Sequence, residues 1–175
     1  KRSATKSPTS LQDENQINLI SDNLNQTSMI ISSVFQNNEY IPSQYTCDGK
    51  NVNPPIIISD APSDAKSLAL IVDDPDAPLK TFVHWTMWNI SPKTNMMPED
   101  EKLQGISEGM TNFGTSGYGG PCPNKGTHRY FFNLYALDTV LDLPADTTRS
   151  ELLEAMHGHI LAEAELMGKY KKVQN

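Results

Sequence analysis

Two histidines that lie far apart in the sequence, His84 and His128, are the residues best suited to bind a ligand. An imidazole can donate a hydrogen bond and can carry a positive charge near neutral pH, so two of them could hold a small anion. His84 lies in an otherwise apolar run, where a histidine is also compatible with a core position and one satisfied hydrogen bond. The sequence leaves both interpretations open.

An acidic segment with two prolines, Asp-Asp-Pro-Asp-Ala-Pro at 73–78, directly follows an apolar run. The carboxylates of Asp74 and Asp76 could orient a histidine or bind the ammonium group of a ligand. Pro75 and Pro78 restrict the backbone of the turn, and a cis peptide bond could precede either of them. The alternative is an ordinary turn in which the acids bond only their own backbone.

A segment rich in glycine and proline, residues 117–126, precedes the second histidine. Glycines let several backbone N–H groups converge on an anion without side chains in the way. We therefore expect Gly119, Gly120 and Pro121 to line the ligand. The alternative is a flexible linker that leads into the next strand.

The strand after this segment opens with His128 and carries Tyr130 on the same face, so Tyr130 is predicted to form a wall of the pocket. Arg129 points to the opposite face. We expect it to act as a structural clamp on an acid, with Asp76 as its partner. The sequence thus predicts one ligand pocket assembled from three distant segments.

The elements that must position these residues are mostly strands. Runs of β-type composition between clusters of Pro, Gly, Asn and Asp predict strands at 29–34, 56–58, 67–73, 81–90 and 129–138. The runs 67–73 and 81–90 are apolar on both faces and should be central strands. In 81–90, strict alternation places His84 on the same face as Phe82, Thr86 and Trp88.

One helix is predicted near the end of the chain, where Thr148 and Glu151 form a capping-box pattern. Apolar residues then repeat at helical spacing, at Leu152, Leu153, Met156, Ile160, Ala164 and Met167, and Gly168 is suited to end the helix. His157 and His159 would lie in this helix. Their spacing does not place them on one face, so they are not a metal-binding pair.

Composition sets the domain organisation and excludes some partners. Residues 1–27 are rich in polar residues and bury little apolar surface, so we expect a flexible tail followed by a single domain at 28–175. The formal net charge is −7 and the basic residues are scattered, which argues against nucleic acid and against charge-driven docking on membranes. No run approaches the roughly 20 apolar residues of a transmembrane helix.

Together, these motifs strongly resemble the phosphatidylethanolamine-binding protein (PEBP) family, in its prokaryotic Raf-kinase-inhibitor-like branch. The matching segments are Tyr-Thr-Cys-Asp-Gly at 45–49, Asp-Asp-Pro-Asp-Ala-Pro at 73–78, Val-His-Trp at 83–85, Asn-Phe-Gly at 112–114, Gly-Tyr-Gly-Gly-Pro-Cys-Pro at 117–123 and Gly-Thr-His-Arg-Tyr at 126–130. The similarity covers residues 28–170, and several motifs in the right order make it specific.

The resemblance implies a mainly β fold: a large antiparallel β-sandwich with peripheral helices, including a C-terminal helix, and an anion pocket at one end. It implies that Asp74, His84, His128, Gly120 and Pro121 hold phosphate, phosphoethanolamine or a similar anion. Branch members are commonly homodimers, so the resemblance implies a homodimer for this chain as well. Some eukaryotic members inhibit kinases or proteases, but no residue of this chain specifies such a partner.

The two cysteines, Cys47 and Cys122, are compatible with a disulfide or with buried free thiols. Within the branch, cysteines in these two segments suggest a bridge between loops. Such a bridge implies an exported protein, periplasmic or extracellular, because disulfides persist in oxidising compartments. A cytoplasmic location is the alternative.

The sequence favours reversible, non-enzymatic binding of a phosphate-type anion, without a cofactor or metal. A hydrolase or metalloenzyme that uses Asp74, His84 and His128 is the alternative, with Ser116 as a candidate nucleophile. The chain has no Gly-x-Ser-x-Gly elbow and no His-Glu-x-x-His helix, which weighs against it. A third interpretation is a protein-interaction module, such as a kinase or protease inhibitor, that docks an anionic group of its partner.

Overall fold

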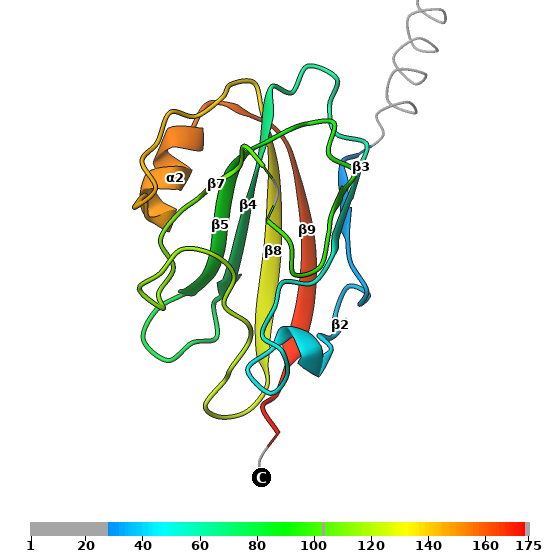
Figure 1. Ribbon diagram of the computed structural model, residues 1–175, viewed down its shortest axis with the longest axis vertical. Helices are drawn as coiled ribbons and strands as arrows, with labels where there is room; N and C mark the ends of the chain where they lie inside the picture. The colour runs from blue at the N-terminus through cyan, green and yellow to red at the C-terminus, as the bar shows by residue number, and fades with distance from the viewer. Residues whose placement is uncertain (1–27, 103, 174–175) are drawn as a thin grey trace, which may run out of the picture.

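A computed structural model describes residues 28–102 and 104–173, which form a mainly β fold (Figure 1). The strands are β1 (Ile30–Ser32), β2 (Glu39–Tyr40), β3 (Ile56–Ser59), β4 (Ser67–Asp74), β5 (Phe82–Ile90), β6 (Met96–Met97), β7 (Ser107–Glu108), β8 (His128–Leu137) and β9 (Ile160–Tyr170). The helices are the 3-10 helix η1 (Ser43–Tyr45) and the α-helix α2 (Arg149–Met156). The predicted tail at 1–27 lies outside the described residues.

The strands form two sheets. A six-stranded sheet has the order β2-β9-β8-β4-β5-β7, and a three-stranded sheet has the order β1-β3-β6. The strand pairs are antiparallel, in agreement with the expected antiparallel fold, except for the short edge strand β2, which runs parallel to β9. The predicted central position of β4 and β5 is confirmed, and all eight residues of β4 are buried.

The large sheet is covered on both faces (Figure 1). On one face, Leu70, Val72 and Phe132 pack in a common core with Ile31 and residues of the small sheet. On the other face, α2 covers a smaller cluster of apolar residues, made of Ala69, Ile71, Trp88, Leu137, Leu141, Leu152 and Met156. Packing on both faces fixes the positions of β4, β5 and β8 relative to one another.

The predicted C-terminal helix is correct at its start and wrong in its length. The capping box of Thr148 and Glu151 is present, but the helix ends at Met156, and Gly158 follows in a left-handed conformation with φ of +81°. No helix within the described part of the chain is long and apolar enough to cross a bilayer.

The helical spacing predicts that the helix continues through Met167 to Gly168, but Ile160–Tyr170 instead form the long strand β9 beside β8. Ala162, Ala164 and Leu166 pack on the core, whereas Glu163 and Glu165 are exposed. This alternation has the period of a strand, and pairing with β8 satisfies the backbone along its length. His159 therefore precedes a strand rather than lying in a helix, and its Nδ1 contacts Asp138 at 2.7 Å.

An irregularity in β5 decides where His84 points. Val72 pairs with Trp85 and Asp73 pairs with Val83, so His84 is one extra residue opposite two neighbours on β4. Such a bulge redirects side chains relative to simple alternation. The His84 ring therefore lies beside Phe82 and Tyr130, on the face of the large sheet that packs against the small sheet. Trp88 belongs to the cluster on the opposite face, under α2, so the predicted shared face with Thr86 and Trp88 is wrong.

Candidate functional site

Asp74 and His128 meet because β4 ends where its antiparallel neighbour β8 begins. The Nδ1 atom of His128 lies 2.7 Å from Oδ2 of Asp74, and both side chains are largely buried. The other Asp74 oxygen accepts a hydrogen bond from the Asp76 N–H at 2.8 Å. Since the carboxylate can only accept, His128 carries a proton on Nδ1, and its Nε2 is the nitrogen left to contact a ligand.

His84 is held in a similar way by a backbone carbonyl. Its Nδ1 lies 2.6 Å from the oxygen of Gly119, which can only accept a hydrogen bond. Burial lowers the pKa of His84, and the carbonyl of Gly119 opposes that effect in part. The unliganded ring is therefore neutral near pH 7, with its proton on Nδ1. Within the described residues, neither histidine makes a hydrogen bond through Nε2.

Tyr130 connects the two histidines. It lies two residues after His128 on the same face of β8, and its ring meets the His84 ring edge-on with centroids 5.1 Å apart. The Tyr130 hydroxyl is buried and has no hydrogen-bond partner of good geometry among the described residues. Burial and the nearby charge of Asp74 raise the pKa of Tyr130, so the hydroxyl keeps its proton. A buried donor without a partner is a group that a ligand could satisfy.

Two phenylalanines that were not predicted as site residues form an aromatic rim. The rings of Phe82 and Phe113 lie 5.1 Å and 5.3 Å from the His84 ring, and Phe113 remains 46% exposed. Asn112 holds this loop on β5, since its side-chain oxygen accepts from the Val83 N–H at 2.7 Å. The signals were available in the sequence, because Phe82 lies two residues before His84 and Phe113 lies in the Asn-Phe-Gly motif.

The predicted cradle of backbone N–H groups at 119–121 is wrong. The Gly119 N–H donates to the His84 carbonyl at 3.0 Å, the Gly120 N–H donates to the side chain of Asn51 at 2.8 Å, and Pro121 has no N–H. The glycines are needed for close approach instead. A Cβ at Gly119 would overlap the Phe113 ring, and a Cβ at Gly120 would overlap the backbone of Tyr45. The segment acts through the Gly119 carbonyl, which orients His84.

Asp76 and Arg129 form a bidentate ion pair at the rim. The guanidinium Nε and Nη2 of Arg129 lie 2.9 Å and 2.7 Å from the two Asp76 oxygens, and these bonds lower the pKa of Asp76 to about 2. This pairing gives Asp76 a structural role in the turn, and its contact with a ligand stays a prediction. The peptide bonds before Pro75 and Pro78 are trans.

Asp73 belongs to the opposite face of the sheet, because neighbouring strand residues alternate. Its carboxylate accepts from Nε of Arg149, on α2, at 2.8 Å. Burial raises the pKa of Asp73, and Arg149 counteracts this rise. The adjacent acids Asp73 and Asp74 therefore have separate tasks: one anchors the helix and the other orients His128.

The structure joins Cys47 and Cys122 in a disulfide, with their Cα atoms 5.4 Å apart. The Cys47 N–H also donates to the Pro121 carbonyl at 3.1 Å. The bridge thereby fastens the glycine-rich segment to the segment around η1. Because Gly119 lies three residues before Cys122, the disulfide supports the loop that orients His84.

Ser116 is the candidate nucleophile of the enzymatic alternative. Ser116 is exposed and bridges Met110 through its backbone, and its hydroxyl makes no hydrogen bond to a histidine among the described residues. Over residues 28–102 and 104–173, no three His, Cys, Asp or Glu side chains are grouped to hold a metal ion.

Comparisons with known proteins agree with the motifs. A UPF0098 protein of Methanothermobacter thermautotrophicus is 50% identical over 143 residues, covering 79% of this chain and 95% of that protein. The crystal structure of a PEBP homolog from Chlamydia trachomatis superposes with a TM-score of 0.81 at 42% identity, covering 83% of this chain and 99% of that one. YbcL of Escherichia coli, described as a member of the mammalian PEBP family, gives 0.78 at 26% identity, with coverages of 84% and 100%.

The family model for phosphatidylethanolamine-binding proteins matches residues 31–171, which span both sheets, α2 and every side chain of the candidate site. The chain belongs to the phosphatidylethanolamine-binding protein family.

Proposed function

We propose that this protein reversibly binds a phosphate-type anion at Asp74, His84 and His128, without chemical change to the anion. One observation carries the proposal: each histidine has its Nδ1 committed to a fixed acceptor, which leaves both Nε2 atoms for a ligand. The buried hydroxyl of Tyr130, which lies near Asp74, adds a third group.

A phosphate monoester suits this arrangement because it both accepts and donates hydrogen bonds. A protonated His128 and the Tyr130 hydroxyl can donate to phosphate oxygens, while the neutral His84 can accept from a P–OH group through Nε2. Each charge-assisted hydrogen bond contributes about 1.5–3 kcal/mol. After the cost of desolvation and ordering, we expect dissociation constants between about 1 μM and 1 mM.

The shared chemistry of the ligands is the phosphoryl group, which occurs in free phosphate and in phosphoethanolamine, the headgroup named in the family. The exposed ring of Phe113 offers an apolar edge beside the site that could contact the rest of a larger ligand. A protein partner that presents a phosphate or carboxylate group would use the same site, and free phosphate should then compete with it. We propose the small anion as the basic ligand in each case.

The test is calorimetric titration of phosphate and of phosphoethanolamine into the wild type and two variants. His128→Gln and Asp74→Asn should each weaken binding by about tenfold or more. Asp74→Asn is the sharper variant, because removing a negative charge would by itself strengthen the binding of an anion. A loss therefore indicates that Asp74 acts by orienting His128.

His159→Gln provides the matched control. His159 and Asp138 form a pair with the same Nδ1-to-carboxylate distance of 2.7 Å, but both side chains are 47% exposed. This variant should bind both ligands as the wild type does. Unchanged binding in His128→Gln and Asp74→Asn, with thermal unfolding showing folded protein, would remove the proposed function.

A further inference from the structure

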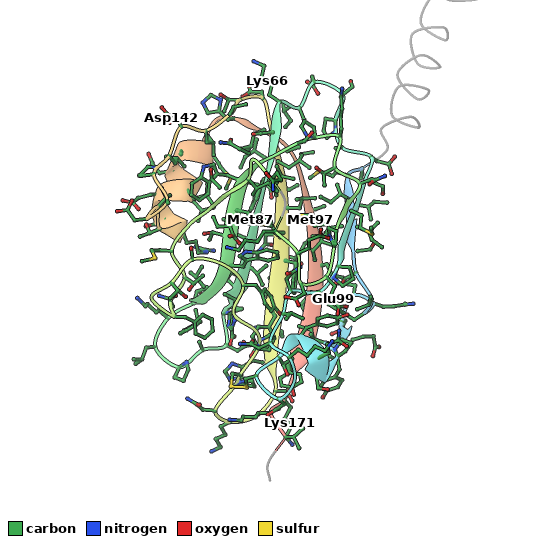
Figure 2. The ribbon with its side chains drawn as sticks, in the orientation of Figure 1. Lys66, Met87, Met97, Glu99, Asp142 and Lys171 are labelled. Atoms are coloured by element: carbon green, nitrogen blue, oxygen red, sulfur yellow. A yellow bond between two sulfur atoms is a disulfide. The ribbon has the colours of Figure 1, made fainter. Side chains whose placement is uncertain are left out.

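A cavity of about 380 Å³ is lined in part by Gly117 and Tyr118, the first residues of the glycine-rich segment. Its buried apolar lining includes Trp85, Met87 and Met97, and the two methionines lie near the middle of the molecule (Figure 2). Tyr118 forms another wall, with its ring edge-on to Trp85 at 5.5 Å. The volume falls within the range of about 300–1,000 Å³ that is usual for small-molecule sites.

This cavity is separate from the anion site, although the two are neighbours in the chain. Its lining contains none of Asp74, His84 or His128. Trp85 directly follows His84, and Tyr118 directly precedes Gly119, whose carbonyl orients His84. Neighbouring residues of one segment thus contribute to each: Gly117 and Tyr118 line the cavity, and Gly119 contacts His84.

Negative charge dominates the mouth of the cavity. Asp100, Glu101 and Glu108 contribute three carboxylates, against the single ammonium of Lys102. Glu108 is the anchored member, because its Oε1 accepts from the Trp85 indole N–H at 2.8 Å. An anionic ligand is disfavoured here, and a cation is favoured.

An ion pair within the protein already places an ammonium group on Glu108. The Lys102 ammonium lies 3.1 Å from Oε2 of Glu108, yet the Lys102 side chain is 81% exposed whereas that of Glu108 is only 18% exposed. An ion pair at the end of a long, solvated side chain is weak and easily exchanged. The exposed Lys102 side chain therefore places its ammonium group on Oε2 of Glu108, where the ammonium group of a ligand could take its place.

We propose that this cavity is a second ligand site, which takes a small organic ammonium ion with an aromatic or aliphatic body. The body packs on Trp85, Met87 and Met97, and the ammonium replaces that of Lys102 on Glu108. The electron-rich faces of Trp85 and Tyr118 also attract a cation. The charge preference of this site is opposite to that of the histidine site.

The test uses two probes with similar bodies and opposite charges, 2-phenylethylammonium and 3-phenylpropionate, followed by tryptophan fluorescence. Trp85 lines the cavity, while the only other tryptophan, Trp88, is fully buried in the cluster under α2 and reports a constant background. The ammonium probe should bind, and the carboxylate probe should bind at least about tenfold more weakly.

Two variants test the proposed contact. Glu108→Gln removes the charge but keeps an oxygen that can accept from the Trp85 indole, so the fold is preserved and affinity for the ammonium should fall about tenfold. Lys102→Gln removes the internal competitor, and affinity should rise by about threefold. Glu163→Gln, an exposed acid on β9, is the matched control and should change nothing.

Three results would overturn the proposal. The first is equal binding of both probes, and the second is unchanged ammonium affinity in both Glu108→Gln and Lys102→Gln. The third is loss of ammonium binding in His128→Gln, which would place the probe in the histidine site. Retained ammonium binding in that variant, at saturating phosphate as well, supports two separate sites.

Discussion

Both histidines of the site are fixed through Nδ1, one by a carboxylate and the other by a backbone carbonyl. The role of Asp74 could be predicted from the sequence, because an acid at a strand end is well placed to orient a histidine. The role of Gly119 could not, because it depends on a loop contact across 35 residues. The sequence pattern indicated N–H donors in that loop, whereas the contact that matters is made by a carbonyl.

Burial of His84 makes anion binding depend on pH. Its pKa is lowered in the free protein, so binding of an anion without protons requires the ring to take up a proton. Sulfate, which does not titrate near neutral pH, should therefore bind more tightly as the pH falls from about 8 to about 5.5. Calorimetry in buffers with different ionisation enthalpies should show proton uptake, and a pH-independent sulfate affinity would contradict this prediction.

The lowered pKa of His84 also predicts that the free energy of unfolding depends on pH. Because the folded pKa of His84 lies below the unfolded value of 6.5, the unfolded state binds more protons just below that pH. The contribution of His84 to the free energy of unfolding is therefore fully present above pH 6.5 and decreases as the pH falls toward the folded pKa. Urea titrations should show this decrease in the wild type and a smaller one in His84→Gln.

At the scale of elements, the strands were the predictable part. The apolar runs that became β4 and β5 have no competing pattern, whereas residues 160–167 fit both a helical and a strand period. The alternation of Ala162 to Leu166 becomes decisive only because β8 offers an edge for pairing. Local pattern alone could not choose between these structures, since the choice depends on a tertiary partner.

The disulfide should stabilise both the fold and the loop that orients His84. It joins residues 75 positions apart, so replacing Cys47 and Cys122 by serine should lower the free energy of unfolding by about 2–5 kcal/mol. Phosphate affinity should fall as well, because the Gly119 carbonyl is held less firmly. Urea titration and calorimetry check both effects.

Wild-type protein treated with a reductant provides the control for that double variant and should behave like it. Unchanged stability in both samples would show that the bridge adds nothing to the fold. Unchanged phosphate affinity together with lowered stability would show that other contacts, such as the Gly120 bond to Asn51, suffice to position the loop.

At the scale of the whole molecule, an acidic protein with a net charge of −7 carries a candidate site for anions. The overall field repels such ligands, so affinity must come from local donors, and added salt should weaken the repulsion.

The mainly β class and the family could be predicted from ordered motifs. The cavity beside Trp85 could not, because its lining residues come from five separate stretches of the chain.

The polar composition of residues 1–27 predicts that they add little to stability, since the core begins with buried Met29 and Ile31. Removing residues 1–27 should shift the unfolding temperature by less than about 2 °C. Removing residues 1–33, which includes β1, should lower it by more than about 5 °C, because the small sheet loses a strand. Scanning calorimetry of both truncations checks this, and a large drop for the shorter one would contradict it.

Because β5 contains one extra residue, the direction of the His84 side chain depends on the number of residues in this strand as well as on their types. Deleting a single residue between Phe82 and Trp85 would restore regular pleating, and an imidazole kept at that point would turn toward the layer beneath α2. There it would lie beside Asp73, which now pairs with Val83, rather than beside Tyr130. A relative could thus retain Asp74 and both histidines and still lose the ligand through a shift of one position.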